Sequence, residues 1–351
     1  MAQSKLARAE ERTAYTLLIP TFIILISIAI VPLFQVFYLS FTNKRFAGSQ
    51  QEQLIGFSNY RNLLSMTLRE LPVELDEDGE PVIEDGEVQY ESWVRVLPRE
   101  PVRYRAVNEF NLFGNRYVLG AVNADFVQSI WDTLVFTFFA VILETLLGLI
   151  IALALSRKFF GRGAMRTAML IPWAIITVVS SLIWEWMFRS DRTGFFNALF
   201  DGIGWTNGRT TWLVNDALQM PSIIAIDVWK TTPFMALLLL AGLSTIPKEL
   251  YEAAEVDGAS KIRQFFSVTL PLLVPTLAVA LIFRTLDSLR VFDLFQIVFG
   301  ELRYSMATFT SFTLVSARDM GLSSAASVII FVILFVFAIF YIRTLGVDTD
   351  G

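Results

Sequence analysis

The 351-residue chain contains no cysteine and no histidine, and only 17% of its residues are charged, against about a quarter in a typical soluble domain. Without cysteine there is no disulfide, thiolate nucleophile, zinc finger or iron–sulfur site. Without histidine there is no imidazole base, HExxH metal site or Ser-His-Asp triad. A carboxylate-only metal site and a Ser–Lys nucleophile remain open. Because 54% of the residues are hydrophobic, the natural second solvent for this chain is lipid.

The negative charge is concentrated in one segment. The formal net charge is −5, and residues 70–91 contain ten acidic residues and no base. The rest of the chain therefore has more basic than acidic residues. Nothing in this pattern indicates nucleic-acid binding.

Long apolar segments dominate the sequence. They span residues 14–41, 127–156, 167–189, 219–246, 271–299 and 323–345. Each covers the ~20 residues that cross ~30 Å of hydrocarbon. The first segment lacks a small-x-small cleavage pattern after a short apolar core, so we interpret it as a retained span. The sequence predicts an all-α polytopic protein with six transmembrane helices.

Basic residues in short loops predict the orientation. The tail at 1–13 carries Lys5, Arg8 and Arg12, and the loop at 157–166 carries four bases and no acid. Both should be cytoplasmic. With six spans, the tail at 346–351 is then cytoplasmic as well.

The outward segment at 42–126 is too long for a plain connection. It contains Asp78-Gly79 and Asp85-Gly86, each flanked by short β-prone stretches. Asp-Gly is a strong signal for a tight hairpin. We expect a small extracytoplasmic β-rich insertion or projecting hairpin, and a solvated acidic loop is the alternative.

The loop at 247–271 joins the fourth and fifth spans. Helix-forming residues fill 248–257, Gly258 interrupts them, and a second helical stretch leads into the next span. Gly258 suits the left-handed conformation that ends a helix. The pattern predicts an amphipathic helix-turn-helix on the cytoplasmic side, and a loop lying on the lipid headgroups is the alternative.

This loop resembles the EAA signature of the membrane subunits of ABC importers. The matching residues are Glu252, Ala253, Ala254, Gly258, Leu270 and Pro271. Gly56-Phe57-Ser58-Asn59-Tyr60 and the stretch from Phe160 to Pro172 resemble two further motifs of the same family. The stretches at 228–234 and 284–287 resemble its sugar branch, most closely the trehalose/maltose type.

The resemblance implies a fold and a set of partners. The fold is that of type I importer permeases, with a five-helix core at 127–345 and an additional first helix at 14–41. The family works with a second permease subunit in a heterodimer, an ATPase subunit dimer and an extracytoplasmic sugar-binding protein. It lies in the bacterial or archaeal plasma (inner) membrane.

By resemblance, the loop at 247–271 couples the bundle to the ATPase. The residues assigned to coupling are Glu252, Ala253, Ala254, Gly258, Leu270 and Pro271. The chain has no G-x-x-x-x-G-K-[ST] loop to cradle nucleotide phosphates. ATP and Mg therefore belong on the partner subunits, this chain binds no cofactor or metal, and it is not an enzyme.

Charged residues occur deep inside two of the spans. At ~1.5 Å per residue, Lys230 lies roughly 16 Å and Arg284 roughly 20 Å from a membrane surface. Asp227, Asp287 and Arg290 lie at helical spacings from them. Such charges should face the bundle interior and be paired, for example Asp287 with Arg284 or with Lys230. Interhelical ion pairing and the wall of a polar pathway are both open interpretations.

The family resemblance places substrate contacts on these two spans. The positions that match the family's substrate contacts are Thr231, Phe234, Arg284, Asp287, Ser288 and Val291. We add the adjacent Lys230 to this predicted substrate pathway. An aromatic ring such as that of Phe234 stacks on a pyranose face. The positions on the second of these spans, from Arg284 to Val291, depart from the maltose-type pattern, which has asparagine and phenylalanine where this chain has charged and small residues. We expect Glu144 to pack against a polar group inside the bundle. Trp173, Trp184, Trp186 and Trp229 are expected as interface anchors.

The sequence therefore favours a permease subunit that forms half of the translocation pathway for an α-linked disaccharide such as trehalose or maltose. Within the same class, glycerol 3-phosphate or another anionic polyol is the alternative substrate. An ion-driven secondary transporter is disfavoured because neither inverted repeats nor broken helices are evident. A membrane-embedded enzyme is disfavoured by the missing histidine and cysteine.

Overall fold

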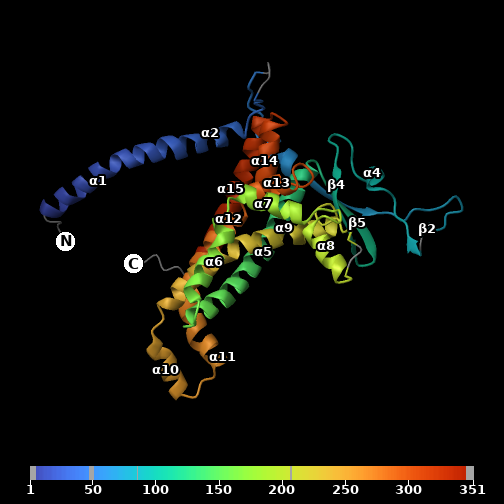
Figure 1. Cartoon of the computed structure of the whole chain (residues 1–351). Helices are drawn as coiled ribbons and strands as arrows, with labels where there is room; N and C mark the ends of the chain where they lie inside the picture. The colour runs from blue at the N-terminus through green and yellow to red at the C-terminus, as the bar shows by residue number, and fades with distance from the viewer. Residues whose placement is uncertain (1–4, 47–50, 85, 206–207, 345–351) are drawn as a thin grey trace.

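The structure is a computed structural model that describes residues 5–46, 51–84, 86–205 and 208–344 (Figure 1). Its helical elements are α1 (Lys5–Leu25), a π-helical segment (Ile26–Ile30), α2 (Val31–Leu39), α3 (Ser58–Leu64), α4 (Trp93–Val96), α5 (Ala124–Ser156), α6 (Arg162–Ala174), α7 (Thr177–Met187), α8 (Phe195–Gly202), α9 (Asp216–Ser244), α10 (Lys248–Val256), α11 (Lys261–Gln264), a second π-helical segment (Phe265–Thr269), α12 (Leu270–Ser288), α13 (Asp293–Val298), α14 (Met306–Val315) and α15 (Met320–Thr344). Its strands are β1 (Met66–Leu71), β2 (Ile83–Glu84), β3 (Glu87–Val88), β4 (Arg105–Leu112) and β5 (Asn115–Ala121).

Within the described residues, five helical runs are long and apolar enough to cross a membrane, and a bent helix pair makes a sixth. The five runs are Arg12–Leu39, Ala124–Ser156, Asp216–Ser244, Lys261–Val298 and Met320–Thr344. They coincide with five of the predicted segments, and the bent pair α6–α7 coincides with the segment at 167–189. The expected all-α polytopic fold is confirmed.

The break between α6 and α7 was not expected. The two helices meet at an angle of 89°. Ile175 and Ile176 are both extended between them, and Pro172 removes one backbone N–H from the last turn of α6. Isoleucine favours an extended backbone conformation because its side chain is β-branched. The expectation that no span is broken is therefore wrong for this segment.

The core of the bundle is formed by α5 and α9, which pack along much of their length, with α12 against both. Small residues allow this close approach. A Cβ on Gly148 of α5 would lie 2.9 Å from the Met235 Cβ of α9, and a Cβ on Gly242 of α9 would lie 2.6 Å from the Thr276 hydroxyl of α12. Glycine at both positions lets the helix backbones touch, as is common between helices in membranes.

A buried asparagine fixes the chain where it leaves α2. Asn59, in the Gly-x-x-Asn-Tyr motif, donates hydrogen bonds of 2.9 Å to the carbonyls of Ser40 and Thr42. Tyr60 donates to the Ser40 hydroxyl at 2.7 Å. The two Asn59 bonds satisfy carbonyls that directly follow α2, where the end of a helix leaves carbonyls without intrahelical partners. The motif therefore ties α3 to the end of the first span.

The segment between the first two spans contains a small β-module at 66–121. Its sheet has the antiparallel order β1-β5-β4, and Leu71, Leu97 and Val118 form its core. The separate hairpin β2–β3 projects from it (Figure 1). Gly79 and Gly86 are left-handed, with φ of +82° and +83°, as the two Asp-Gly turns require. The expected β-rich insertion is confirmed, although Asp85 lies outside the described residues.

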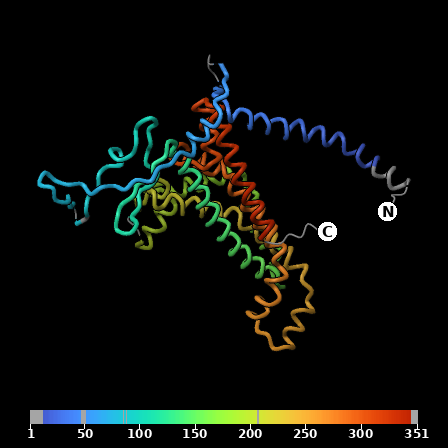
Figure 2. Tube along the Cα trace, turned by 180° about the vertical axis from the view of Figure 1, so that it is seen from behind, coloured from blue at the N-terminus to red at the C-terminus, as the bar shows by residue number. Residues whose placement is uncertain are grey.

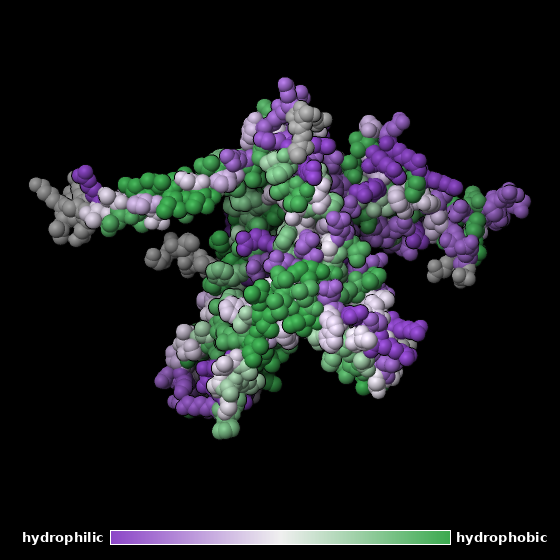
Figure 3. All heavy atoms as spheres, turned by 45° about the horizontal axis from the view of Figure 1, so that its top comes forward, coloured by the Kyte–Doolittle hydropathy of each residue, from purple (hydrophilic) through white to green (hydrophobic). Residues whose placement is uncertain are grey.

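The first span points away from the bundle. Figure 2 shows α1 leaving the other helices, and none of its most apolar window is buried. Only its continuation α2 packs on α15, where the rings of Phe37 and Phe331 lie 5.9 Å apart. Figure 3 shows apolar surface along this helix and over the bundle, with polar surface over the β-module. This helix needs lipid or a partner to cover it.

Candidate functional site

One arginine at the centre of the bundle holds three carboxylates from three helices. Arg284 of α12 pairs through Nη2 with Glu144 Oε1 of α5 at 2.9 Å and through Nη1 with Asp287 at 2.7 Å. Its Nε also bonds Glu144, and its Nη2 bonds Asp227 of α9. The Thr231 hydroxyl lies within hydrogen-bond distance of Glu144 Oε1. The network therefore ties α5, α9 and α12 together.

Burial differs sharply within this network. The side chains of Arg284 and Glu144 are 4% and 0% exposed, and that of Asp227 is 12% exposed. Asp287 is 69% exposed. Buried charges at this depth are tolerated only when they are paired, and the guanidinium fork offers several directed N–H groups for that purpose. Arg284, Glu144 and Asp227 are thus paired with one another in the interior, whereas the Asp287 carboxylate is accessible although it also pairs with Arg284.

Lys230 has a different partner from the one expected. Its ammonium donates a 2.9 Å hydrogen bond to the carbonyl of Ile175, at the break between α6 and α7. This carbonyl belongs to an extended residue that ends α6. The predicted ion pair of Asp287 with Arg284 is present, and the alternative pair of Asp287 with Lys230 is not among the ion pairs of the described residues.

Two adjoining cavities, of about 620 and 290 Å³, lie beside this network. All seven residues predicted for the substrate pathway line one or both of them. Thr231, Phe234, Arg284 and Asp287 line the larger cavity, and Lys230, Thr231, Arg284, Asp287, Ser288 and Val291 line the smaller. The structure thus gathers the residues that the sequence singled out.

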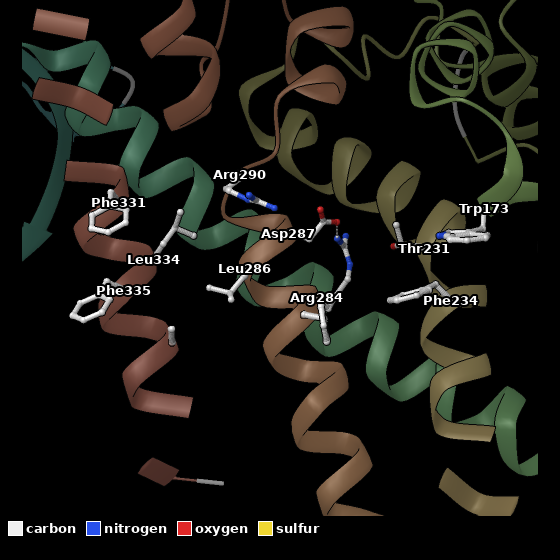
Figure 4. Close-up of a pocket in the computed structure, with 12 residues that line it drawn as sticks. Trp173, Thr231, Phe234, Arg284, Leu286, Asp287, Arg290, Phe331, Leu334 and Phe335 are labelled. Carbon is white, nitrogen blue, oxygen red and sulfur yellow. Dashed lines mark hydrogen bonds and ion pairs between the residues drawn. The ribbon is translucent and has the colours of Figure 1, made fainter. Parts of the chain in front are cut away.

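Aromatic side chains line the larger cavity on both sides of the charged residues Arg284 and Asp287. Figure 4 shows Trp173 and Phe234 on one side, Phe331 and Phe335 on the other, and Arg284 with its neighbours between them. The rings of Trp173 and Phe234 are stacked, with centroids 5.8 Å apart and planes at 12°. Trp173 was expected as an interface anchor, and the structure instead places it in the cavity wall beside Phe234.

This combination suits a polyhydroxylated ligand. Aromatic faces cover the apolar face of a sugar ring, and Asp287 accepts hydrogen bonds from hydroxyl groups. Arg284 has little positive charge to offer because three carboxylates already surround it. In the described ranges no group of carboxylates is arranged to hold a metal ion.

The loop after α9 forms a second site at one end of the bundle. Helix α10 ends at Val256, and Gly258 follows with φ of +76°. The N–H groups of Gly258 and Ala259 donate to the carbonyls of Glu255 and Ala254 at 3.0 and 2.8 Å. This is the Schellman arrangement that ends helices at glycine. The predicted helix-turn-helix is thus the observed structure.

The predicted coupling residues form an accessible surface on this loop. Glu252, Ala253 and Gly258 are exposed, and Ala254 is half-buried. Leu270 and Pro271 begin α12, directly after the π-helical segment. A hydrogen bond from the Lys261 ammonium holds the pKa of the neighbouring Glu255 carboxyl below its ordinary value.

Some of the site could not be found from sequence motifs. Glu144 and Asp227 were noted as intramembrane acids, but their common partner Arg284 lies 140 and 57 residues away. A second buried pair joins Asp132 of α5 to Arg303, with both bonds at 2.7 Å, near the β-module. An acid within an apolar helix signals such a pair in the sequence but does not identify its partner.

Comparison with known proteins agrees with this architecture. Residues 144–345 match the family described as "Binding-protein-dependent transport system inner membrane component". The trehalose/maltose transport system permease protein MalF of Thermococcus litoralis is 44% identical over 234 residues, which cover 66% of this chain and 78% of the relative. The trehalose transport system permease protein SugA of Mycobacterium tuberculosis is 39% identical over 62% of this chain and 70% of the relative.

A solved structure shows the same fold over nearly the whole chain. It is described as a bacterial alginate ABC transporter in complex with an alginate pentasaccharide-bound periplasmic protein. The TM-score is 0.69 at 20% identity, and the match covers 98% of each chain. The chain therefore belongs to the binding-protein-dependent transport system inner membrane components, the non-catalytic membrane-spanning permeases of ABC importers.

Proposed function

We propose that this permease forms half of the pathway for an α-linked disaccharide of the trehalose/maltose type and moves it by alternating access. The second half is a different permease subunit, ATP and Mg bind to a dimer of ATPase subunits, and an extracytoplasmic binding protein delivers the sugar. The observation that carries the proposal is the mid-bundle cavity, which combines the Trp173–Phe234 stack with Asp287. The trehalose/maltose relatives support the same substrate class.

An anionic substrate such as glycerol 3-phosphate is less well served by this cavity. Arg284 is surrounded by three carboxylates, and Lys230 donates to a backbone carbonyl. Neither Lys230 nor Arg290 has an ion pair in the described residues, but only Arg290 is exposed, whereas the ammonium of Lys230 already donates to a carbonyl. Membership of the importer family also removes the ion-driven secondary transporter from consideration.

The test is ATPase stimulation of the reconstituted complex with its own binding protein. Trehalose, maltose, glucose and glycerol 3-phosphate are supplied in turn. Stimulation by a disaccharide alone supports the proposal. Stimulation by glycerol 3-phosphate alone would overturn the substrate class and make Arg290 the first residue to mutate.

We assign energy coupling to the exposed surface of α10 and its turn. Glu252 and Ala253 are free to enter a groove on an ATPase subunit, and the Schellman turn at Gly258 holds the helix end rigid. A Cβ at Gly258 would meet no atom within 4 Å, so Gly258→Ala strains only the backbone. That cost is about 1–2 kcal/mol. We expect this variant to assemble but to transport less sugar per ATP, and full coupling would contradict the assignment.

We assign the β-module to docking of the binding protein. Its hairpin projects beyond the sheet, and Val73 and Tyr90 form a bridging pair at the hairpin base. Replacing residues 74–89 by a short Gly-Ser turn therefore removes the hairpin and leaves β1 intact. Stimulation of ATPase activity by the binding protein should weaken while the complex still assembles. Unchanged stimulation would contradict this role.

The orientation in the membrane follows from basic residues at one end of the bundle. The α5–α6 loop at 157–161 and the loop carrying α10 lie together there (Figure 1). We place this end, and both termini, in the cytoplasm of a bacterial or archaeal cell, because loops rich in Lys and Arg remain inside. Labelling of single cysteines introduced into a chain that has none would test this orientation directly.

A further inference from the structure

A cavity of about 1000 Å³ lies at the end of the bundle opposite the β-module, and the transport mechanism does not use it. It is formed where α5 ends and α6 begins, against the loop that carries α10 and α11. Five basic side chains line it: Arg157, Lys158, Arg162, Lys248 and Lys261. Among the described residues no Asp or Glu lines it. The cavity is thus built for negative charge.

Most of these cations have no ion-pair partner among the described residues. Lys261 pairs with Glu255 of the same loop. In the part of the chain that the structure describes, no ion pair involves the other four cations. The Nε of Arg162 is buried and has no hydrogen-bond partner there. A buried cationic N–H without an acceptor is unfavourable, and this indicates that the acceptor comes from another molecule.

The rest of the wall combines apolar side chains with the polar residues Ser156, Ser244, Tyr251, Gln264 and Thr269. Leu153, Leu240 and Leu243 come from the membrane-spanning helices, and Phe265 and Phe266 come from the π-helical segment. Phe266 is 62% exposed and Ile262 is 73% exposed, so both present apolar surface outward beside the cations. A site with cations on one side and exposed aliphatic and aromatic groups on the other matches the two ends of a lipid molecule.

We propose that this cavity binds the phosphate headgroup of an anionic phospholipid, with the acyl chains lying along α5 and α9. Basic pockets between helices at the cytoplasmic side of a bundle are suited to such headgroups. The residues assigned to ATPase docking, Glu252, Ala253 and Gly258, do not line the cavity. The lipid and the ATPase therefore contact different residues of the same loop. The proposal rests on the proposed function in one respect, the assignment of this end of the bundle to the cytoplasmic leaflet.

The experiment measures lipid retention by native mass spectrometry of the purified transporter complex, with phosphatidylglycerol and phosphatidylcholine as probes. The test variant is Arg157→Gln with Arg162→Gln. The matched control is Arg12→Gln with Arg343→Gln, which removes two exposed cations outside the cavity. Each cation of the cavity that contacts the headgroup contributes about a fivefold preference for the anionic lipid. The test variant should lose the preference by roughly 30-fold, and the control should keep it.

Several outcomes decide the proposal. An unchanged preference in the test variant, or an equal loss in the control, overturns it. Displacement of the bound anion by millimolar inorganic phosphate would assign the site to a soluble phosphate instead. Binding of the lipid only after the ATPase subunits are stripped from the complex would assign the cations to that protein and overturn the proposal. If the double variant fails to assemble, Lys248→Gln on α10 should by itself lower the preference about fivefold, and no change there would also overturn the proposal.

Discussion

Removing Arg284 should destabilise the transporter far more than removing any one of its acidic partners. The reason is the imbalance of charge, because one guanidinium faces Glu144, Asp227 and Asp287. Arg284→Gln would leave two buried carboxylates without a cation. Breaking a buried ion pair in this way costs about 3–5 kcal/mol. The folding equilibrium should fall by roughly two to three and a half orders of magnitude.

The acidic variants should behave differently. Glu144→Gln removes one of the surplus negative charges and keeps an oxygen for the Thr231 hydroxyl, so its cost should not exceed about 1.5 kcal/mol. Asp287→Asn breaks a pair whose carboxylate is 69% exposed, and exposed pairs contribute about 0–1 kcal/mol. The double variant Arg284→Gln with Glu144→Gln should recover part of the arginine loss, because it buries one uncompensated charge fewer.

The assay is unfolding of the purified complex in mixed micelles titrated with sodium dodecyl sulfate. Tryptophan fluorescence and far-ultraviolet circular dichroism report tertiary and helical structure. Sugar uptake by the same variants is measured in proteoliposomes. The reasoning fails if Glu144→Gln costs as much as Arg284→Gln, or if Arg284→Gln costs less than about 1 kcal/mol. In the second case the guanidinium of Arg284 does not stabilise the fold, and its role is confined to the transport pathway.

Two further predictions concern the cavity and its movement. Trp173→Ala should reduce sugar transport about tenfold or more without loss of assembly, because it removes one aromatic wall; Trp186→Ala, which is exposed and outside both cavities, should transport normally. Spin labels on cysteines introduced at Leu147 of α5 and Val279 of α12 should keep their separation when ATP binds. The separation between labels at Leu147 and at Val179 of α7 should change. The opposite result in pulsed electron paramagnetic resonance would contradict a rigid α5–α9–α12 core.

The sequence predicts the spans and the helix-turn-helix well because these are local patterns. Apolar length determines where a helix crosses lipid, and Gly258 ends α10 through its own backbone freedom. The Asp78-Gly79 turn is local for the same reason. The main sheet was not predicted strand by strand, because β1 pairs with β5 across the whole β-module and no local signal specifies that pairing.

The site was predicted in its residues but not in its contacts. The seven pathway residues were selected from depth in the membrane and from family resemblance, and all of them line the two cavities. The partners of Arg284 could not be chosen from sequence, since several intramembrane acids were equally available. Trp173 was misplaced because the bend at Ile175 and Ile176 moves it from a span end to the cavity wall, and tryptophan alone does not signal such a bend.

The two sites are connected by the helices that carry them. Helix α10 lies between α9 and α12, and the acids held by Arg284 come from α5, α9 and α12. Because separating these helices would expose an unpaired buried charge, the α5–α9–α12 core should move as one body when α10 is displaced. In the described residues no buried ion pair joins the α6–α7 pair to this core: Lys230 donates one hydrogen bond to a neutral carbonyl of the bend, and Trp173 stacks on Phe234. Opening of the cavity between Phe234 and Trp173 is therefore expected at this bend, where a rearrangement leaves no buried ion pair broken.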